Sequence, residues 1–214
     1  MSDPQALAEQ FDDLGQQRHA AELGMWIFLA TEALFFGGLL LGYAVYRHLY
    51  PEAWFAAARE TEILIGTANT AILLTSSLTM WLAVRAGEEG RRDAVTLALG
   101  LTATLGAFFL GLKAYEYYLD WDNSLVPGLR FAFEKADPEH AEIFYYLYFF
   151  LTGVHAVHLT VAITAVLVVL FLVRTGRLAY QQSATLTVLG LYWHLVDVVW
   201  IFLYPLIYLP GRSQ

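Results

Sequence analysis

Cysteine is absent from this sequence, and its absence limits the chemistry open to the chain. Disulfide bonds, thiolate metal sites and a redox-active thiol are all excluded. Charged residues are also scarce: they make up 15% of the 214 residues, and 12 Lys and Arg stand against 20 Asp and Glu. Because a nucleic-acid-binding protein needs a basic stripe or patch, the sequence argues against a nucleic-acid partner.

The motifs of common soluble enzymes are missing as well. The sequence holds no Gly-rich phosphate-binding loop, no nucleophile elbow and no His-Glu-x-x-His pair. The chain therefore has no visible apparatus for catalysis on its own. Any enzymatic role would have to come from a larger complex.

Apolar residues dominate what is present. They make up 58% of the chain, and its mean hydropathy is +0.50, which is too apolar for one soluble domain of this size. A helix needs roughly 20 apolar residues to cross a bilayer, and a backbone in lipid must satisfy its own hydrogen bonds. The sequence thus predicts an all-α membrane protein, a five-transmembrane-helix bundle within residues 23–210, with helices at about 24–46, 63–84, 94–118, 143–173 and 184–209.

Arginines suggest how the chain is oriented. They gather in two short connections, residues 85–93 and 174–180, which the positive-inside rule places in the cytoplasm. Five crossings then make residues 1–22 a cytoplasmic tail and put the C-terminus on the outer side. The loop at 120–142 is mostly acidic and lies on the outer side as well. We expect this loop either to face a basic partner or simply to be solvated.

Glu32 is the most unusual residue for a lipid environment. It lies about eight residues, or roughly 12 Å, into the first apolar stretch. Carboxylates inside a membrane are costly and usually functional, so we expect a proton-related or lipid-related role. The simpler alternative is a protonated carboxyl that makes one hydrogen bond between helices.

Four further polar residues lie in the last two stretches. His155 and His158 are three residues apart and share a helix face, and so do His194 and Asp197. These two faces would meet inside the bundle. The four residues are candidates for buried polar pairing or lipid contact, and ligation of a haem or metal is the less favoured alternative.

One other pair and the aromatic residues have simpler interpretations. Lys113 and Glu116 have the spacing of an interfacial ion pair, to which we assign no chemistry. The tryptophans, and many tyrosines near the expected helix ends, fit aromatic belts at the two membrane interfaces.

The last apolar stretch contains the run Tyr-Trp-His-Leu-Val-Asp-Val-Val-Trp-Ile-Phe-Leu-Tyr at residues 192–204. This run resembles the last-helix signature of cytochrome c oxidase subunit III. Four other segments match in the order of that family, so the resemblance covers nearly all of residues 19–209; they are residues 24–36, 69–77, 111–117 and 152–158. Larger members have seven helices, and this chain looks like their last five.

The resemblance implies a non-catalytic subunit of a respiratory haem-copper terminal oxidase. Such a subunit supports proton uptake, active-site stability and access of lipid and oxygen, and it binds phospholipid but no metal. Haem and copper belong to the catalytic subunit I, which is the expected partner together with other oxidase subunits and membrane lipids. Glu32 falls at the family's carbodiimide-reactive carboxylate, and the other candidates fall at its buried polar positions, namely His155, His158, His194 and Asp197. The implied location is a bacterial inner membrane.

Three alternatives stay open. Five-helix relatives also accompany nitric oxide reductases, so the partner is either an oxidase or that reductase. The chain would otherwise be a stand-alone b-type cytochrome, with His158 or His155 opposite His194, or a small proton-coupled transporter that uses Glu32 and Asp197. The sequence shows no second histidine pair and no inverted repeat, which disfavours the last two. It leaves undetermined the haem types, the electron donor and the bound lipids.

Overall fold

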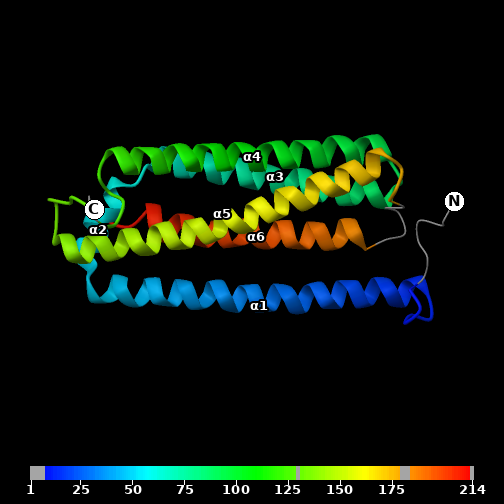
Figure 1. Cartoon of the computed structure of the whole chain (residues 1–214), viewed down its shortest axis with the longest axis horizontal. Helices are drawn as coiled ribbons and strands as arrows, with labels where there is room; N and C mark the ends of the chain where they lie inside the picture. Colours follow the sequence, from blue (N-terminus) through cyan, green and yellow to red (C-terminus); the bar gives the residue numbers. More distant parts are fainter. Residues whose placement is uncertain (1–7, 129–130, 179–183, 213–214) are drawn as a thin grey trace. The chain divides into compact units, whose positions relative to one another are not determined.

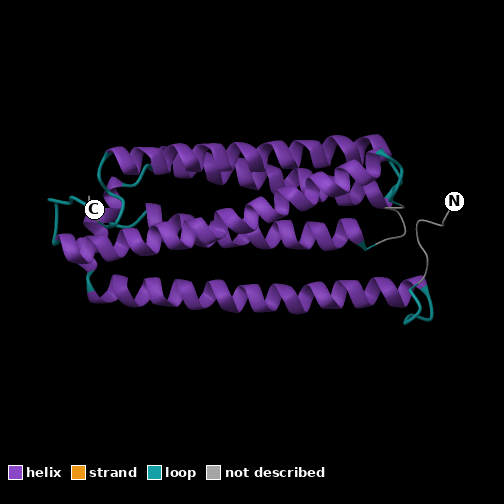
Figure 2. Cartoon of the chain, viewed as in Figure 1, coloured by secondary structure: helices purple, strands orange, loops and turns teal. Residues whose placement is uncertain are grey.

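The computed structural model of the chain describes residues 8–128, 131–178 and 184–212. Within these residues all regular structure is helical, as Figures 1 and 2 show. Five helices are long and apolar enough to cross a membrane: α1 (Leu14–Leu49), α3 (Ile63–Glu88), α4 (Arg92–Asp122), α5 (Pro138–Arg174) and α6 (Thr185–Tyr208). The predicted all-α class and the five spanning helices are therefore confirmed.

Several helices extend beyond the expected apolar stretches. α1 begins at Leu14, so it reaches back into the segment that we assigned to an N-terminal tail. α1 and α5 contain 36 and 37 residues, against roughly 20 that one crossing requires. Helices of this length either tilt within the bilayer or project from it.

A short helix, α2 (Pro51–Glu60), lies in a stretch that we expected to be only a connection. Proline is favoured at the first position of a helix, where its missing N–H costs nothing. The buried side of α2 repeats at intervals of four residues, with Ala53 and Trp54 followed by Ala57 and Ala58. We did not predict α2 from the sequence because it has only ten residues, and three of its four buried residues are small alanines.

The chain forms two compact units, and each unit draws a segment from all five spanning helices. Unit 1 comprises Met1–Ala33, Leu73–Ala107 and His158–Asp197. Unit 2 comprises Leu34–Ile72, Phe108–Val157 and Val198–Gln214, so it also contains α2.

Close backbone packing characterises the core of unit 1. A side chain at Gly106 would place its Cβ atom 2.8 Å from the ring of Trp193 and 3.0 Å from Ile163. Trp193 is fully buried, and its indole N–H donates to the hydroxyl of Ser76 at 3.1 Å. The glycine thus makes room for the largest side chain of this core, as small residues commonly do between membrane helices.

Aromatic rings fill the core of unit 2. Trp54 of α2 meets Tyr43 of α1 and Phe144 of α5 edge-to-face, with ring centroids 5.1 and 5.3 Å apart. The hydroxyl of Tyr43 donates to the carbonyl of Leu206 in α6 at 2.5 Å. Aromatic pairs of this geometry add roughly 0.5–1.5 kcal/mol each beyond their buried area. α2 therefore contributes to the core and does not merely connect two spans.

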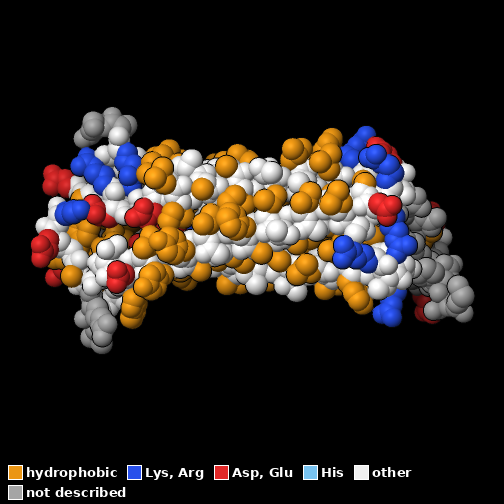
Figure 3. Space-filling view, turned by 90° about the horizontal axis from the view of Figure 1, so that it is seen from above, with side chains coloured by type: hydrophobic (Ala, Val, Ile, Leu, Met, Phe, Trp, Pro, Cys, Tyr) orange, Lys and Arg blue, Asp and Glu red, His pale blue; other side chains and the backbone are white. Residues whose placement is uncertain are grey.

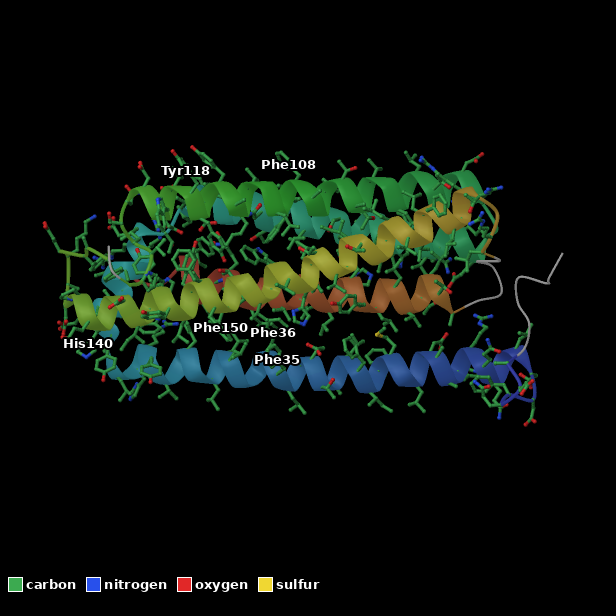
Figure 4. The ribbon with its side chains drawn as sticks, in the orientation of Figure 1. Phe35, Phe36, Phe108, Tyr118, His140 and Phe150 are labelled. Atoms are coloured by element: carbon green, nitrogen blue, oxygen red, sulfur yellow. The ribbon has the colours of Figure 1, made fainter. Side chains whose placement is uncertain are left out.

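The outer surface of the helices is apolar. In Figure 3 hydrophobic side chains cover the middle of the spanning helices, and charged side chains lie near helix ends. Phe108 and Tyr118 point outward from α4 in Figure 4 and are 58% and 62% exposed. Such extensive apolar exposure is unfavourable in water but expected for side chains that face lipid.

The two arginine-rich connections approach each other within unit 1. The guanidinium of Arg92, at the start of α4, donates to the carbonyl of Arg174, at the end of α5, at 2.5 Å. A cation at this place satisfies one of the free carbonyls of the α5 C-terminus. Both connections thus lie on the same side, as the positive-inside argument requires, while the identity of that side stays a prediction.

Candidate functional site

Glu32 and His158 form a polar pair between α1 and α5 in unit 1. The Oε2 atom of Glu32 lies 3.0 Å from Nε2 of His158, which is hydrogen-bond distance. The side chains are only 18% and 19% exposed. Tyr192 of α6 joins them, because its hydroxyl donates to the carbonyl of His158 at 3.3 Å. The expected carboxylate is thus paired with one of the expected histidines.

This pairing has a chemical consequence. A lone carboxylate in a membrane interior is strongly disfavoured, and an imidazole partner lowers that cost. One hydrogen lies between the two heteroatoms, either on Glu32 or on His158. The arrangement provides the interhelical hydrogen bond that the simpler sequence interpretation required, and it is also a place where a proton can reside. Its participation in proton transfer stays a prediction.

His194 finds its partner on α3. Its Nδ1 atom lies 2.8 Å from the hydroxyl of Ser77. Asp197, one turn later on α6, is 3% exposed. The hydroxyl of Ser77 lies near the Asp197 carboxyl group. Within the described part of the chain, however, the two carboxyl oxygens accept no hydrogen bond of good geometry.

His155 has a different environment from His158, although both lie on one face of α5. Its ring is 1% exposed and packs against Phe109 and Trp200 of unit 2, with centroids 5.6 and 5.2 Å away. We expected the two polar faces of α5 and α6 to meet. His155 does contact Trp200 of α6, while the side-chain hydrogen bonds described for His158 and His194 go to α1 and α3.

Residues 8–128, 131–178 and 184–212 contain no group of three or more His, Asp or Glu side chains placed to hold a metal ion.

Unit 2 contains a second group of buried polar residues, centred on Lys113 and Glu116 of α4. Their ion pair was expected at the membrane interface, but the side chains are only 3% and 0% exposed. The ammonium of Lys113 donates to Glu116 Oε2 at 3.1 Å and to the hydroxyls of Tyr148 and Tyr208 at 3.0 and 2.8 Å. The predicted ion pair is thus confirmed, and it is buried among the helices, while its depth in the membrane stays a prediction.

Two tyrosines and a second carboxylate complete this group. Glu116 Oε1 lies 2.7 Å from the hydroxyl of Tyr208 and 2.9 Å from that of Tyr148, and the Tyr148 hydroxyl also lies 2.9 Å from Asp120 Oδ2. Lys113, Glu116 and Asp120 share one face of α4. That polar stripe in an apolar helix was the signal in the sequence. We missed it because the tyrosines were assigned to interfacial belts.

The acidic loop at 120–142 is held at several points in unit 2. Lys135 pairs with Glu60 at 2.6 Å, and His140 pairs with Asp137 at 2.5 Å. The His140 ring, labelled in Figure 4 near the start of α5, stacks on Tyr50 with ring centroids 3.8 Å apart. Tyr50, Lys135, Asp137 and His140 line a surface pocket of about 480 Å³. The basic partner of this loop stays a prediction, and residues 129–130 lie outside the described part.

Known proteins of one family resemble the chain. The model of the family described as cytochrome c oxidase subunit III matches residues 14–212, which contain all five spanning helices. Cytochrome c oxidase subunit 3 of Thermostichus vulcanus is 32% identical over 191 residues, covering 89% of this chain and 87% of the relative. The same subunit of Alkalihalophilus pseudofirmus is 31% identical over 192 residues, covering 88% and 86%. Cytochrome bo(3) ubiquinol oxidase subunit 3 of Pseudomonas aeruginosa is 29% identical over 188 residues, covering 88% and 84%.

Proposed function

Because this chain belongs to the cytochrome c oxidase subunit III family, we propose that it is the non-catalytic third subunit of a respiratory haem-copper terminal oxidase. Its relatives are named for a cytochrome c oxidase and for a ubiquinol oxidase, so the proposal covers the class of complex and not its electron donor. The haem and copper would belong to the partner catalytic subunit I.

In this proposal the three histidines predicted inside the bundle do not bind a metal. His158 pairs with Glu32, and His194 pairs with Ser77. His155 packs between aromatic rings. These contacts orient each imidazole within the helix bundle. They favour a supporting subunit over a stand-alone b-type cytochrome, which needs two histidines facing one haem.

The hydrogen bond between Glu32 and His158 is the observation that carries the proposed role in proton uptake. A carboxyl and an imidazole that share one hydrogen can exchange it with little movement of either side chain. Next to a proton entry path of subunit I, this pair would also change the local field and hydration without touching substrate. We therefore assign Glu32 a proton-related supporting role.

Lipid contact is supported by the open surface of α1. Within its most apolar 18-residue stretch α1 buries 11% of its residues, whereas α6 buries 50%. Side chains at Gly37, Gly38 or Gly42 would meet no atom within 4 Å. Small residues let another helix or an acyl chain approach closely, so we propose that phospholipid or another oxidase subunit covers this surface and that oxygen reaches the complex through the lipid there.

The proposed location is a bacterial inner membrane, with the N-terminus in the cytoplasm and the C-terminus outside. The arginines at the ends of α3, α4 and α5 support this orientation. A tag that reports its compartment, placed at the C-terminus, tests it directly.

The proposal is tested by purifying the complex in a mild detergent through a C-terminal tag. The chains that co-purify and the haem spectrum are then read together. We expect a haem-copper oxidase subunit I and a haem spectrum that disappears when that subunit is removed. Recovery with nitric oxide reductase subunits would replace the oxidase by that complex. Recovery of the chain alone with bound haem would overturn the proposal in favour of an independent cytochrome.

A further inference from the structure

The buried polar residues around Lys113 make more hydrogen-bond contacts than they have hydrogens to fill, if both carboxyl groups are ionised. These residues are Lys113, Glu116, Asp120, Tyr148 and Tyr208, which we call the lysine cluster. All five side chains are at most 3% exposed. Their polar atoms form six contacts within hydrogen-bond distance, from 2.7 to 3.1 Å. Each of these contacts needs a hydrogen between its two heavy atoms.

The hydrogens can be counted residue by residue. A lysine ammonium carries three, each tyrosine hydroxyl carries one, and an ionised carboxylate carries none. Lys113 uses its three on Glu116, Tyr148 and Tyr208. Tyr208 uses its one on Glu116. The single hydrogen of Tyr148 is then left to serve both Glu116 Oε1 and Asp120 Oδ2, each 2.9 Å away. Five hydrogens thus face six contacts.

The charges of the lysine cluster are unbalanced in the same way. One ammonium and two carboxylates leave a net charge of −1 among side chains removed from water. A buried charge without compensation is strongly unfavourable. One added proton neutralises the cluster and supplies the sixth hydrogen.

Asp120 is the better place for that proton. Glu116 accepts from the ammonium of Lys113 and from Tyr208, and both contacts stabilise its ionised form. Within the cluster Asp120 makes one hydrogen-bond contact, with the Tyr148 hydroxyl, and it interacts with the Lys113 ammonium without a hydrogen bond. We propose that the lysine cluster is a proton-binding site, in which protonated Asp120 donates to Tyr148, and Tyr148 donates to Glu116.

The groups around the cluster favour the bound proton. Glu62, just before α3, interacts electrostatically with Asp120. Tyr145 of α5 and Tyr117 of α4 also lie within reach of Asp120. Glu60, at the end of α2, interacts electrostatically with Tyr145 and forms an ion pair with Lys135. These neighbours therefore add negative charge and neutral hydroxyls. Two cations lie near them: Lys135 is paired with Glu60, and Arg212 donates to the backbone carbonyls of Tyr208 and Thr61.

Asp120 lies close to the end of α4. α4 ends two residues later at Asp122, which is exposed, and the intervening Trp121 is 59% exposed.

The lysine cluster belongs to unit 2, whereas Glu32 and His158 belong to unit 1. The site is thus independent of the proposed role of Glu32, and either can fail without the other.

Infrared spectroscopy of the purified complex tests this site, because the C=O stretch of a protonated carboxyl is separate from the bands of carboxylates and shifts in D₂O. At neutral pH we expect Asp120→Asn to remove one such band. Asp122→Asn is the matched control, since it changes an exposed carboxyl on the same helix and should remove none. Identical spectra for Asp120→Asn and the parent would overturn the proposal, as would loss of the same band in Asp122→Asn.

A second variant keeps the test valid if Asp120→Asn does not assemble. Tyr148→Phe removes the hydroxyl to which Asp120 donates. The band of the protonated carboxyl should then move to higher frequency, because its hydrogen bond is lost. A band that stays in place would show that no protonated carboxyl is bonded to Tyr148, and would overturn the proposal.

Discussion

Glu32 of α1 and His158 of α5 are 126 residues apart in the chain, and their side chains lie 3.0 Å apart within unit 1. A glutamine in place of Glu32 keeps a hydrogen-bonding group at the same position but cannot ionise. We expect Glu32→Gln to leave assembly and the haem spectrum of the complex unchanged, and to alter proton uptake or the rate of inactivation during turnover. Glu22→Gln, on the same helix, is the control. If Glu32→Gln prevents assembly, the residue is structural.

The energy of the Glu32 and His158 contact can be measured separately from its function. A double-mutant cycle with Glu32→Gln, His158→Gln and the combined variant isolates the coupling between the two side chains. We expect a coupling of about 0.5–3 kcal/mol, the range for residues in direct contact. Thermal unfolding of the complex in detergent provides the measurement. If the changes in unfolding free energy of the two single variants simply add up in the double variant, the two side chains do not interact in the complex.

The buried ion pair of Lys113 and Glu116 should respond differently from an exposed one. Glu116→Gln removes the carboxylate that pairs directly with the buried Lys113 ammonium, and breaking a buried ion pair costs about 3–5 kcal/mol. We expect a large fall in the unfolding temperature, partly restored by adding Lys113→Met. Glu88→Gln is the control, because Arg85 and Glu88 pair at 2.8 Å but are 54% and 57% exposed. Such exposed pairs contribute about 0–1 kcal/mol. Equal losses from the two variants would contradict the burial of the Lys113 pair.

Glycines on α4 provide a test of packing in unit 1. Gly106→Ala places a methyl group against Trp193, and overpacking of this kind costs about 1–3 kcal/mol. Gly100→Ala is the control, since its new side chain meets nothing within 4 Å. Alanine is the better helix former by about 0.5–1 kcal/mol, so the control should be neutral or stabilising. Unfolding temperatures that rank the two variants in the opposite order would contradict this packing.

The length of apolar stretches made the five spanning helices predictable, because a bilayer of fixed thickness demands long uninterrupted helices. The same criterion missed α2, which buries only four of its ten residues. Glu32 was found because carboxylates are costly in lipid. The pairing of Glu32 with His158 was not predicted, because contacts between helices depend on helix rotation and tilt. The spacing of residues within one helix does not specify either. Lys113 and Glu116 were paired from their spacing, but Tyr148 and Tyr208 arrive from α5 and α6.

The composition of the two units has a consequence for biosynthesis. Each unit takes a segment from α6, which follows the other described helices in the chain and is therefore synthesised after them. Neither core is complete before that helix is inserted, because Gly106 packs against Trp193 and Tyr43 donates to the carbonyl of Leu206, both in α6. Until then the nascent chain presents unfilled helix surfaces to the insertion machinery and to any neighbouring subunit. A premature stop before residue 184 would leave both units incomplete, and quality-control proteases should recognise such a product as unfinished.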